Sequence, residues 1–343
     1  MVKRAIKKIT GPLFLAVGLV LLVLLIRKFG FANLLKVYEH LGLNLIYILL
    51  VPFLGFVFHT FGWYWAIEET GSHVSFPQLL KIKLGGESVN TLTPVSFMGG
   101  DPVRILLLTR TMPGALSTAS VVLDRTMQSL AIVVLLLCGL TVAWIDLELP
   151  HAWKILFPAI TLALILLLWF LIHRQQKGIF ESLVNLFHRL GFKSDRISRL
   201  KEHIEVVDHR IADFYRHNKR RFAAVLVCHV GGRFVGVGEI YLIARLLKIP
   251  IGFEGALYLA SLTVLINIVF VFIPGSMGVL EGAFGALCHL LNLNPLSGVA
   301  IQLVRRLRAI FWVFVGLILM GTLKQRGNEP NVKTLEKNRA FSP

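Results

Sequence analysis

A small set of charged residues lies within the apolar segments of this 343-residue chain. A charge at the centre of a bilayer is costly unless it is paired or hydrated. Each of these residues is therefore a candidate either for ligand binding or for an ion pair that holds helices together. The set comprises Glu87, Asp101, Arg104, Asp124, Arg125, Arg233, Glu239, Glu281, Arg305, Arg306 and Arg308.

Three arginines of this set, Arg104, Arg125 and Arg305, favour the binding of an anion. The guanidinium group is planar and donates two parallel hydrogen bonds to a phosphate or a carboxylate. At bilayer depth the expected anion is the head group of a phospholipid. For Arg233 and Glu239, a salt bridge that only fixes the helix bundle is an equal alternative.

Asp124 and Arg125 are adjacent in an apolar segment. They cannot neutralise each other by facing contact, because consecutive residues of a helix point in different directions. We therefore expect each of them to find its partner on another helix.

Two clusters of proline and glycine interrupt the apolar pattern. Glycine permits close backbone approach and unusual dihedral angles, and a half-helix that starts after such a break directs its N-terminal amides towards an anion. Packing of helices through small residues is the alternative explanation. We expect no catalytic or metal-binding residue. The predicted lipid-binding residues are Asn90, Pro94, Gly99, Gly100, Asp101, Arg104, Asp124, Arg125, Pro274, Gly275, Gly278, Glu281 and Arg305.

The two clusters are related by a constant offset of 180 residues, which indicates an internal duplication. The apolar segments around them repeat at the same offset. Paired, interrupted hydrophobic segments at matching positions of two halves are typical of a transporter site near the bilayer midplane. The matching residues are Pro94, Ser96, Asp101 and Arg125 in one half and Pro274, Ser276, Glu281 and Arg305 in the other.

The elements that carry these residues are predicted to be membrane helices, because 55% of the residues are hydrophobic and several apolar runs are long enough to span a bilayer. Four shorter pieces, 76–92, 95–108, 257–273 and 277–293, form two broken hairpins. We predict an all-α polytopic membrane protein with about six full spans and two re-entrant hairpins in inverted repeats; eight full spans is the alternative. The predicted full spans are 11–26, 41–67, 120–144, 153–172, 222–247 and 299–320.

The formal net charge of +17 is concentrated between the apolar runs, as the positive-inside bias requires. Residues 174–221 hold the largest basic block and two amphipathic helical patterns, so we predict a cytoplasmic insert there. Both termini are then cytoplasmic, in a bacterial inner membrane. The predicted organisation is one membrane domain over 1–323, with repeat A at about 41–146 and repeat B at about 221–324, followed by a cytoplasmic tail at 324–343.

Other classes of function lack support in the sequence. No fold motif of nucleic-acid binding accompanies the basic charge. Cys138, Cys228 and Cys288 lie in apolar runs without metal-like spacing, so we expect neither a disulfide nor a metal site. No phosphate loop or nucleophile elbow occurs, and we expect no cofactor. A membrane transferase built on Asp101, Asp124 and Glu281 is the enzymatic alternative.

The motifs Asn90-Thr-Leu-Thr-Pro94, Gly99-Gly100, Arg104, Asp124-Arg125 and Pro274-Gly-Ser-Met-Gly-Val-Leu-Glu281 resemble those of the flippase-like family. This family is the transmembrane region of lysylphosphatidylglycerol synthases and its stand-alone relatives. The resemblance covers about residues 13–323. The family pattern often has Glu where Asp124 stands, a difference that keeps the charge.

The resemblance implies translocation of a lipid between leaflets, without the soluble aminoacyltransferase domain of the full synthases. We expect a lipid translocator or lipid-binding protein whose ligand is a membrane phospholipid or another amphiphilic lipid. The alternative is an accessory protein of lipid, hopanoid or isoprenoid biosynthesis, with a separate lipid-modifying enzyme as its partner. Nucleic acid is not an expected partner. Stand-alone relatives have mixed assignments, so the resemblance leaves the lipid, the direction of transport and the oligomeric state open.

Overall fold

The structure is a computed structural model, and it describes residues 41–68, 74–93, 99–146, 151–175, 207–215, 219–270 and 278–323. Regular secondary structure in these ranges is helical throughout. The predicted span at 11–26 and the tail at 324–343 lie outside the described residues. A further helix covers 207–215. The labelled helices are η1 (Gly42–Asn44), α3 (Leu45–Glu68), α4 (Phe76–Leu92), α5 (Gly100–Leu108), α6 (Gly114–Asp146), α7 (His151–Gln175), α10 (Lys219–Leu246), α11 (Phe253–Val269), α12 (Val279–Leu290) and α13 (Pro295–Gly321).

The predicted class, an all-α polytopic membrane protein, is confirmed. On the outer face of α7, Ile155, Leu162 and Trp169 are exposed, which suits contact with lipid chains. The helices α11 and α12 are apolar but shorter. Among the described residues, the helices that are long and apolar enough to cross a bilayer are Gly42–Ile67, Gly114–Asp146 and Lys219–Leu246.

Most helix boundaries follow the predicted segments, and the differences have local causes. The helix α13 begins at Pro295, before the predicted start at residue 299, because the Asn294 side chain caps it and accepts a hydrogen bond from Leu296 N at 2.9 Å. The helix α6 begins directly after Pro113, six positions before the predicted start at Ser120. Backbone breaks and caps, rather than hydropathy, therefore set these ends.

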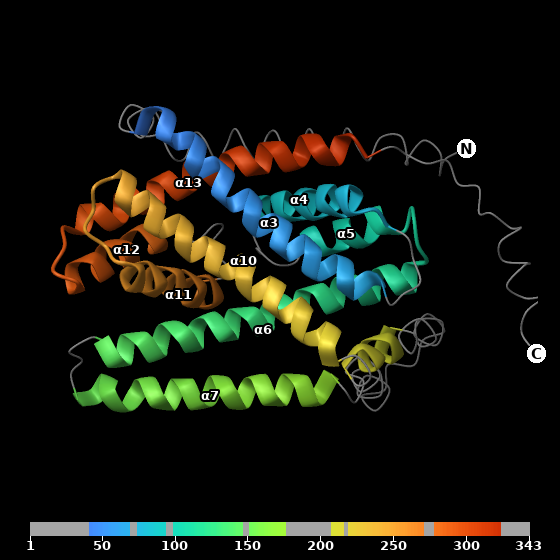
Figure 1. The fold of residues 1–343 in the computed structure, drawn as a ribbon, viewed down its shortest axis with the longest axis horizontal. Coiled ribbons are helices and arrows are strands. Elements are labelled where there is room, and N and C mark those ends of the chain that lie inside the picture. The colour runs from blue at the N-terminus through green and yellow to red at the C-terminus, as the bar shows by residue number, and fades with distance from the viewer. Residues whose placement is uncertain are drawn as a thin grey trace, which may run out of the picture.

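The long helices α3 and α10 cross the middle of the molecule side by side and run in opposite directions (Figure 1). The helices α6 and α7 lie along one side of this pair, and α13 lies along the other. Between them, α4 and α5 occupy one half of the view and α11 and α12 the other. The short helices are thus enclosed by long ones.

The helices repeat at the offset found in the sequence. With 180 residues added, α3, α4, α5 and α6 fall on α10, α11, α12 and α13, with end points that differ most at the start of α10 and at the end of α13. Corresponding helices α6 and α13 run in opposite directions, as α3 and α10 do (Figure 1). Each half also packs onto the other, since α13 contacts α4 and α6 contacts α11.

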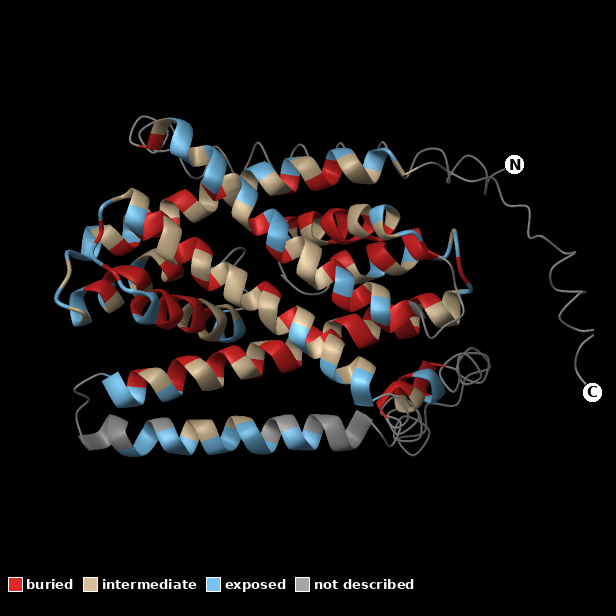
Figure 2. Ribbon diagram, viewed as in Figure 1, coloured by how far each residue is buried: buried red, intermediate tan, exposed pale blue. Residues whose placement is uncertain are grey.

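Close packing joins the two halves where α13 crosses α4. Gly316 of α13 lies so near the Leu84 carbonyl and the Ser88 hydroxyl of α4 that a Cβ at this position would collide with both. Buried residues run along α6 and α4, whereas α7 is largely exposed on its outward face (Figure 2). The buried interior of α3, α4, α5, α6 and α10 is not uniformly apolar, and its charged side chains gather in one place.

Candidate lipid-binding site

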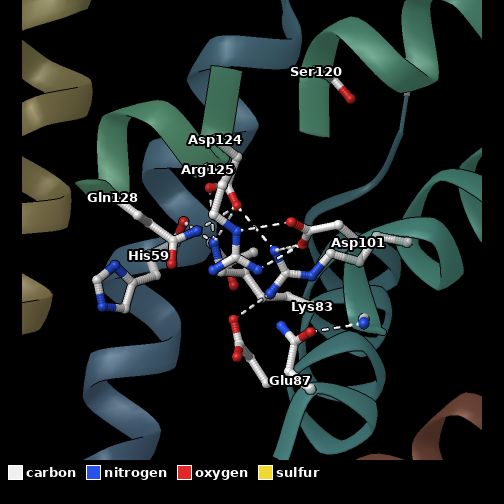
Figure 3. Close-up of polar contacts among 12 residues, drawn as sticks. His59, Lys83, Glu87, Asp101, Ser120, Asp124, Arg125 and Gln128 are labelled. Carbon is white, nitrogen blue, oxygen red and sulfur yellow. Dashed lines mark hydrogen bonds and ion pairs between the residues drawn. The ribbon is translucent and has the colours of Figure 1, made fainter. Parts of the chain in front are cut away.

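Asp124 of α6 is the centre of a buried polar network (Figure 3). Its carboxylate accepts hydrogen bonds from Lys83 Nζ at 2.8 and 2.9 Å and from Gln128 Nε2 at 2.6 Å. A third donor, Arg104 Nη1 of α5, lies 3.3 Å away. All four side chains are buried, so the carboxylate is held by donors from its own helix, α4 and α5.

Arg104 extends this network towards two more carboxylates. Its Nη2 pairs closely with Glu87 of α4, and its Nη1 lies 3.4 Å from Asp101 at the start of α5. Asp101 in turn accepts a bidentate pair from Arg125, with Nε at 2.8 Å and Nη2 at 2.6 Å. Such paired guanidinium and carboxylate groups are the strongest charge-assisted contacts in proteins.

The network is balanced in formal charge, with three cations and three carboxylates. The indole ring of Trp63 on α3 lies beside it, 5.4 Å from Lys83 Nζ and 5.6 Å from the guanidinium carbon of Arg104. An aromatic face near desolvated cations adds a favourable electrostatic contact. The cations are Lys83, Arg104 and Arg125, and the carboxylates are Glu87, Asp101 and Asp124.

The expectation that Asp124 and Arg125 have partners on other helices is confirmed. Asp124 pairs with Lys83 of α4 and Arg104 of α5, and Arg125 pairs with Asp101 of α5. The two neighbours thus tie α6 to both arms of the first hairpin. This pairing gives the network a structural role whatever else it does.

Asn90 and Gly100 join the end of α4 to the start of α5. The Asn90 side-chain oxygen accepts a hydrogen bond from Gly100 N at 2.7 Å, which satisfies a backbone donor at the start of α5. A Cβ on Gly100 would collide with the Gly86 carbonyl and with Asn90, so the hairpin arms approach too closely for a larger residue. Gly99 precedes α5, and Pro94 lies outside the described residues.

A second polar cluster surrounds Arg305 of α13. Its Nη1 donates to Thr263 Oγ1 and to Gln302 Oε1, each at 3.1 Å, and its guanidinium lies 5.5 Å from the centre of the Phe284 ring. Its Nε has no hydrogen-bond partner among the described residues. The group therefore donates to neutral oxygens and retains an unused donor.

The other arginines of α13 have acidic partners. Arg306 Nε lies 3.0 Å from Glu281, and Arg308 Nε lies 3.1 Å from Glu239 of α10. Glu281 also accepts a hydrogen bond from Gly278 N at 2.7 Å and so caps α12. Gly278 has a φ of 79°, a conformation that favours glycine. Pro274 and Gly275 lie outside the described residues.

Arg305 borders a cavity of about 220 Å³ between the two halves. Its walls come from α4, α11, α12 and α13. The side chains around it are mainly polar, and Glu87 of the first network reaches it. The lining residues are Glu87, Asn90, Thr91, Thr263, Asn267, Leu280, Gln302, Arg305, Arg306, Arg308 and Ala309.

The two halves use their matching positions differently. Arg125 and Arg305 correspond at the 180-residue offset, and so do Asp101 and Glu281. Asp101 binds Arg125, whereas Glu281 binds Arg306 instead of Arg305. The second half also replaces the other charged positions of the first network with neutral ones. Lys83, Glu87, Arg104 and Asp124 correspond to Thr263, Asn267, Phe284 and Val304.

Three further residues belong to the site although they are not among the predicted ones. Lys83 lies in the largely apolar segment 76–92, and its ammonium group is the main partner of Asp124. His59 and His229, on α3 and α10, contact each other beside the network at 2.9 Å. The sequence contains a pattern that could have indicated this pair. Each histidine lies in an apolar span and is followed three residues later by a glycine, which leaves room for a side chain of the neighbouring helix.

Arg233 and Glu239, both on α10, have different surroundings. Glu239 pairs with Arg308, in keeping with the salt-bridge alternative. Arg233 has a buried Nε without a hydrogen-bond partner in the described part of the chain. No group of three His, Cys, Asp or Glu residues within the described ranges has the geometry to hold a metal ion.

Comparison with family models matches residues 13–317 to the lysylphosphatidylglycerol synthase TM region. No curated protein and no solved structure matches the chain. The matched range includes both hairpins, the charged network and the cavity. The chain therefore belongs to the family of the lysylphosphatidylglycerol synthase transmembrane region.

Proposed function

We propose that the chain binds the anionic head group of a membrane phospholipid in the cavity beside Arg305 and transfers the lipid between leaflets. The observation that carries this proposal is the state of Arg305, which donates to two neutral oxygens and has an unused Nε. A phosphate oxygen would supply the acidic partner that Arg125 finds in Asp101. Membership of a membrane family named for a lipid synthase supports the same ligand class.

The shape of the cavity suits a head group rather than a whole lipid. A volume of about 220 Å³ accommodates a phosphodiester and part of its alcohol, while the acyl chains remain along apolar helix faces. Glu87, which also lines the cavity, would select against a second negative charge or contact a cationic substituent. The head group would thus be held at both a positive and a negative position.

We further propose that the halves are inverted repeats with two re-entrant hairpins. The helix α5 has 9 residues and α12 has 12, which at 1.5 Å per residue is well below the roughly 30 Å of a bilayer core. The opposite directions of corresponding helices support the inversion (Figure 1). In such an arrangement one site can open to either leaflet when the halves rock against each other.

Transfer of lipid is tested with purified protein in vesicles of phosphatidylcholine and phosphatidylglycerol that carry a fluorescent phosphatidylglycerol. A membrane-impermeant reductant bleaches only label in the outer leaflet. The protein is expected to expose inner-leaflet label to the reductant, whereas protein-free vesicles keep it protected. Bleaching equal to that of protein-free vesicles would contradict a transfer function and favour the accessory or transferase alternatives.

The cytoplasmic side is proposed to be the end of the bundle where α10 begins. This end carries Lys219, Arg220 and Arg221 and the helix 207–215 (Figure 1), as the positive-inside bias would place it in a bacterial inner membrane. The opposite end carries both signs of charge. Its charged residues include Asp146, Arg245, Lys248 and Glu254.

Orientation is tested by single cysteines in a variant without Cys138, Cys228 and Cys288. Thr111→Cys, after α5, is expected to react with an impermeant maleimide only in opened cells. Leu290→Cys, at the end of α12, is expected to react in intact cells, because the two hairpins would enter from opposite faces. Labelling of both residues from the same side would overturn the inverted arrangement.

A further inference from the structure

Two histidines meet where α3 and α10 cross. Nδ1 of His59 lies 2.9 Å from Nδ1 of His229, and the ring centres are 5.2 Å apart with an interplanar angle of 29°. His229 is fully buried. Because a hydrogen bond between two Nδ1 atoms requires one donor and one acceptor, the neutral rings must hold different tautomers.

A glycine on the opposite helix leaves space for each of the two rings. Gly62 of α3 faces the His229 ring, and Gly232 of α10 faces the His59 ring. A Cβ on Gly62 would lie 2.8 Å from His229 Nε2, and one on Gly232 would lie 2.7 Å from His59 Nε2. Each helix therefore provides one imidazole and the space for the other, and the pair depends on the position of one helix against its neighbour.

The pair is continuous with the charged network. His229 Nε2 lies 3.5 Å from Asp124 Oδ1, and Lys83 Nζ donates to the His59 carbonyl oxygen at 3.1 Å. A proton on His229 Nε2 faces the carboxylate, which makes its Nδ1 the acceptor and His59 Nδ1 the donor. The remaining lone pair of the two rings is then on His59 Nε2.

This arrangement can accept one proton without losing its hydrogen bond. A proton that binds His59 Nε2 makes that ring an imidazolium, which still donates through Nδ1. Transfer of the Nδ1 proton to His229 moves the positive charge next to Asp124, and His59 becomes neutral again with its proton on Nε2. The atoms and charge balance, because one proton enters and one unit of positive charge is gained.

We propose that His59 and His229 bind one proton between them and that this proton is taken up together with the anionic head group, so that lipid transfer responds to the proton gradient. The coupling rests on the function proposed above, whereas the proton site does not.

The charges around the pair explain why an anion would matter. The cations that act on it are Lys83 of α4, Arg104 of α5 and Arg233 of α10, and the carboxylate is Asp124 of α6. The charged residue of helix α11 is Glu254, which lies in its first turn. On α13, Arg305, Arg306 and Arg308 line the cavity instead.

When the cavity is empty, a proton added to the histidine pair is therefore surrounded by more cations than carboxylates. A head-group anion near Arg305 and Glu87 would add negative charge beside the network, since Glu87 lines the cavity and pairs with Arg104. By linkage, the anion then increases proton affinity by the factor by which the proton increases anion affinity, which for typical coupled sites is about fivefold or more.

Proton binding is tested by ¹⁵N NMR of histidine-labelled protein in nanodiscs of phosphatidylcholine, with and without phosphatidylglycerol. His59→Asn and His229→Asn should each remove one ring signal and shift the other. Phosphatidylglycerol should move the titration of the pair to higher pH by more than it moves the exposed His289, which reports the surface potential. Ring signals that respond independently, or that move only as much as His289 does, would overturn the proposal.

The coupling is tested in vesicles with and without an imposed pH gradient. His59→Asn alone leaves His229 Nδ1 able to take up the proton, so both histidines are replaced. The double variant His59→Asn/His229→Asn is expected to lose the response to the gradient, whereas His289→Gln keeps it. A full response in the double variant would overturn the coupling. If the wild-type protein moves no lipid, the proposed function fails instead, and the NMR titration alone decides the proton site.

Discussion

Asp124→Asn is expected to lower the free energy of unfolding by about 3–5 kcal/mol, the usual effect of removing one partner from a buried ion pair. The carboxylate accepts hydrogen bonds from Lys83, Arg104 and Gln128 in a fully buried site. An asparagine there leaves two desolvated cations without their shared counter-charge. Thermal unfolding of the purified protein in detergent measures the effect, and Glu254→Gln, at an exposed carboxylate, is the matched control.

A double-mutant cycle with Lys83→Met separates the ion pair from packing. If the Lys83 and Asp124 contact carries the effect, the double variant should lose less stability than the sum of the two single variants. Asp124→Asn within about 0.5 kcal/mol of the wild type, the usual range of surface changes, would contradict a structural role for this carboxylate.

Arg305→Gln is expected to leave the protein folded in detergent and to weaken binding of phosphatidylglycerol. Loss of one charge-assisted contact removes roughly 1.5–3 kcal/mol, which corresponds to about tenfold or more in affinity. The fold should tolerate the change because Arg305 donates to neutral oxygens and strands no carboxylate. Binding to lipid nanodiscs of defined composition measures it, with Arg245→Gln, at an exposed end of α10, as the control for general charge effects.

Arg125→Gln gives the contrasting case at the matching position. Here the guanidinium holds Asp101 in a bidentate pair, so its removal leaves that carboxylate with only the longer contact to Arg104 Nη1 and should lower the melting temperature. An Arg305 variant that loses stability in the same way while keeping its lipid affinity would remove Arg305 from the binding site. Arg125 and Arg305 would then stabilise the fold without binding lipid.

Hydropathy and the repeat offset predicted the helices well because both reflect the whole length of a segment. The segment predicted at 76–92 is α4, and the broken pattern after it separates α4 from α5. Predictions were weaker at helix ends, such as Pro295, because a single cap or proline decides those positions. The span predicted at 11–26 and most of the insert predicted at 174–221 lie outside the described residues.

The charged network was predictable in its location but not in its pairings. Charge inside apolar segments selected Asp101, Arg104 and Asp124, yet a sequence does not show which side chains on different helices face each other. Lys83 is not among the predicted residues because the segment around it is mostly apolar and its partner is 41 positions away. The difference between Arg125 and Arg305 was also hidden, since it depends on Glu281 pairing with the next arginine along the helix.

The equal numbers of cations and carboxylates in the network of α4, α5 and α6 have an electrical consequence. Moving one elementary charge across a membrane potential of 100 mV involves about 2.3 kcal/mol. A rigid-body displacement of Lys83, Arg104 and Arg125 together with their three carboxylates carries no net charge and does almost no work against that field. The voltage dependence of such a displacement would then report the charge of the bound lipid and of any accompanying ion.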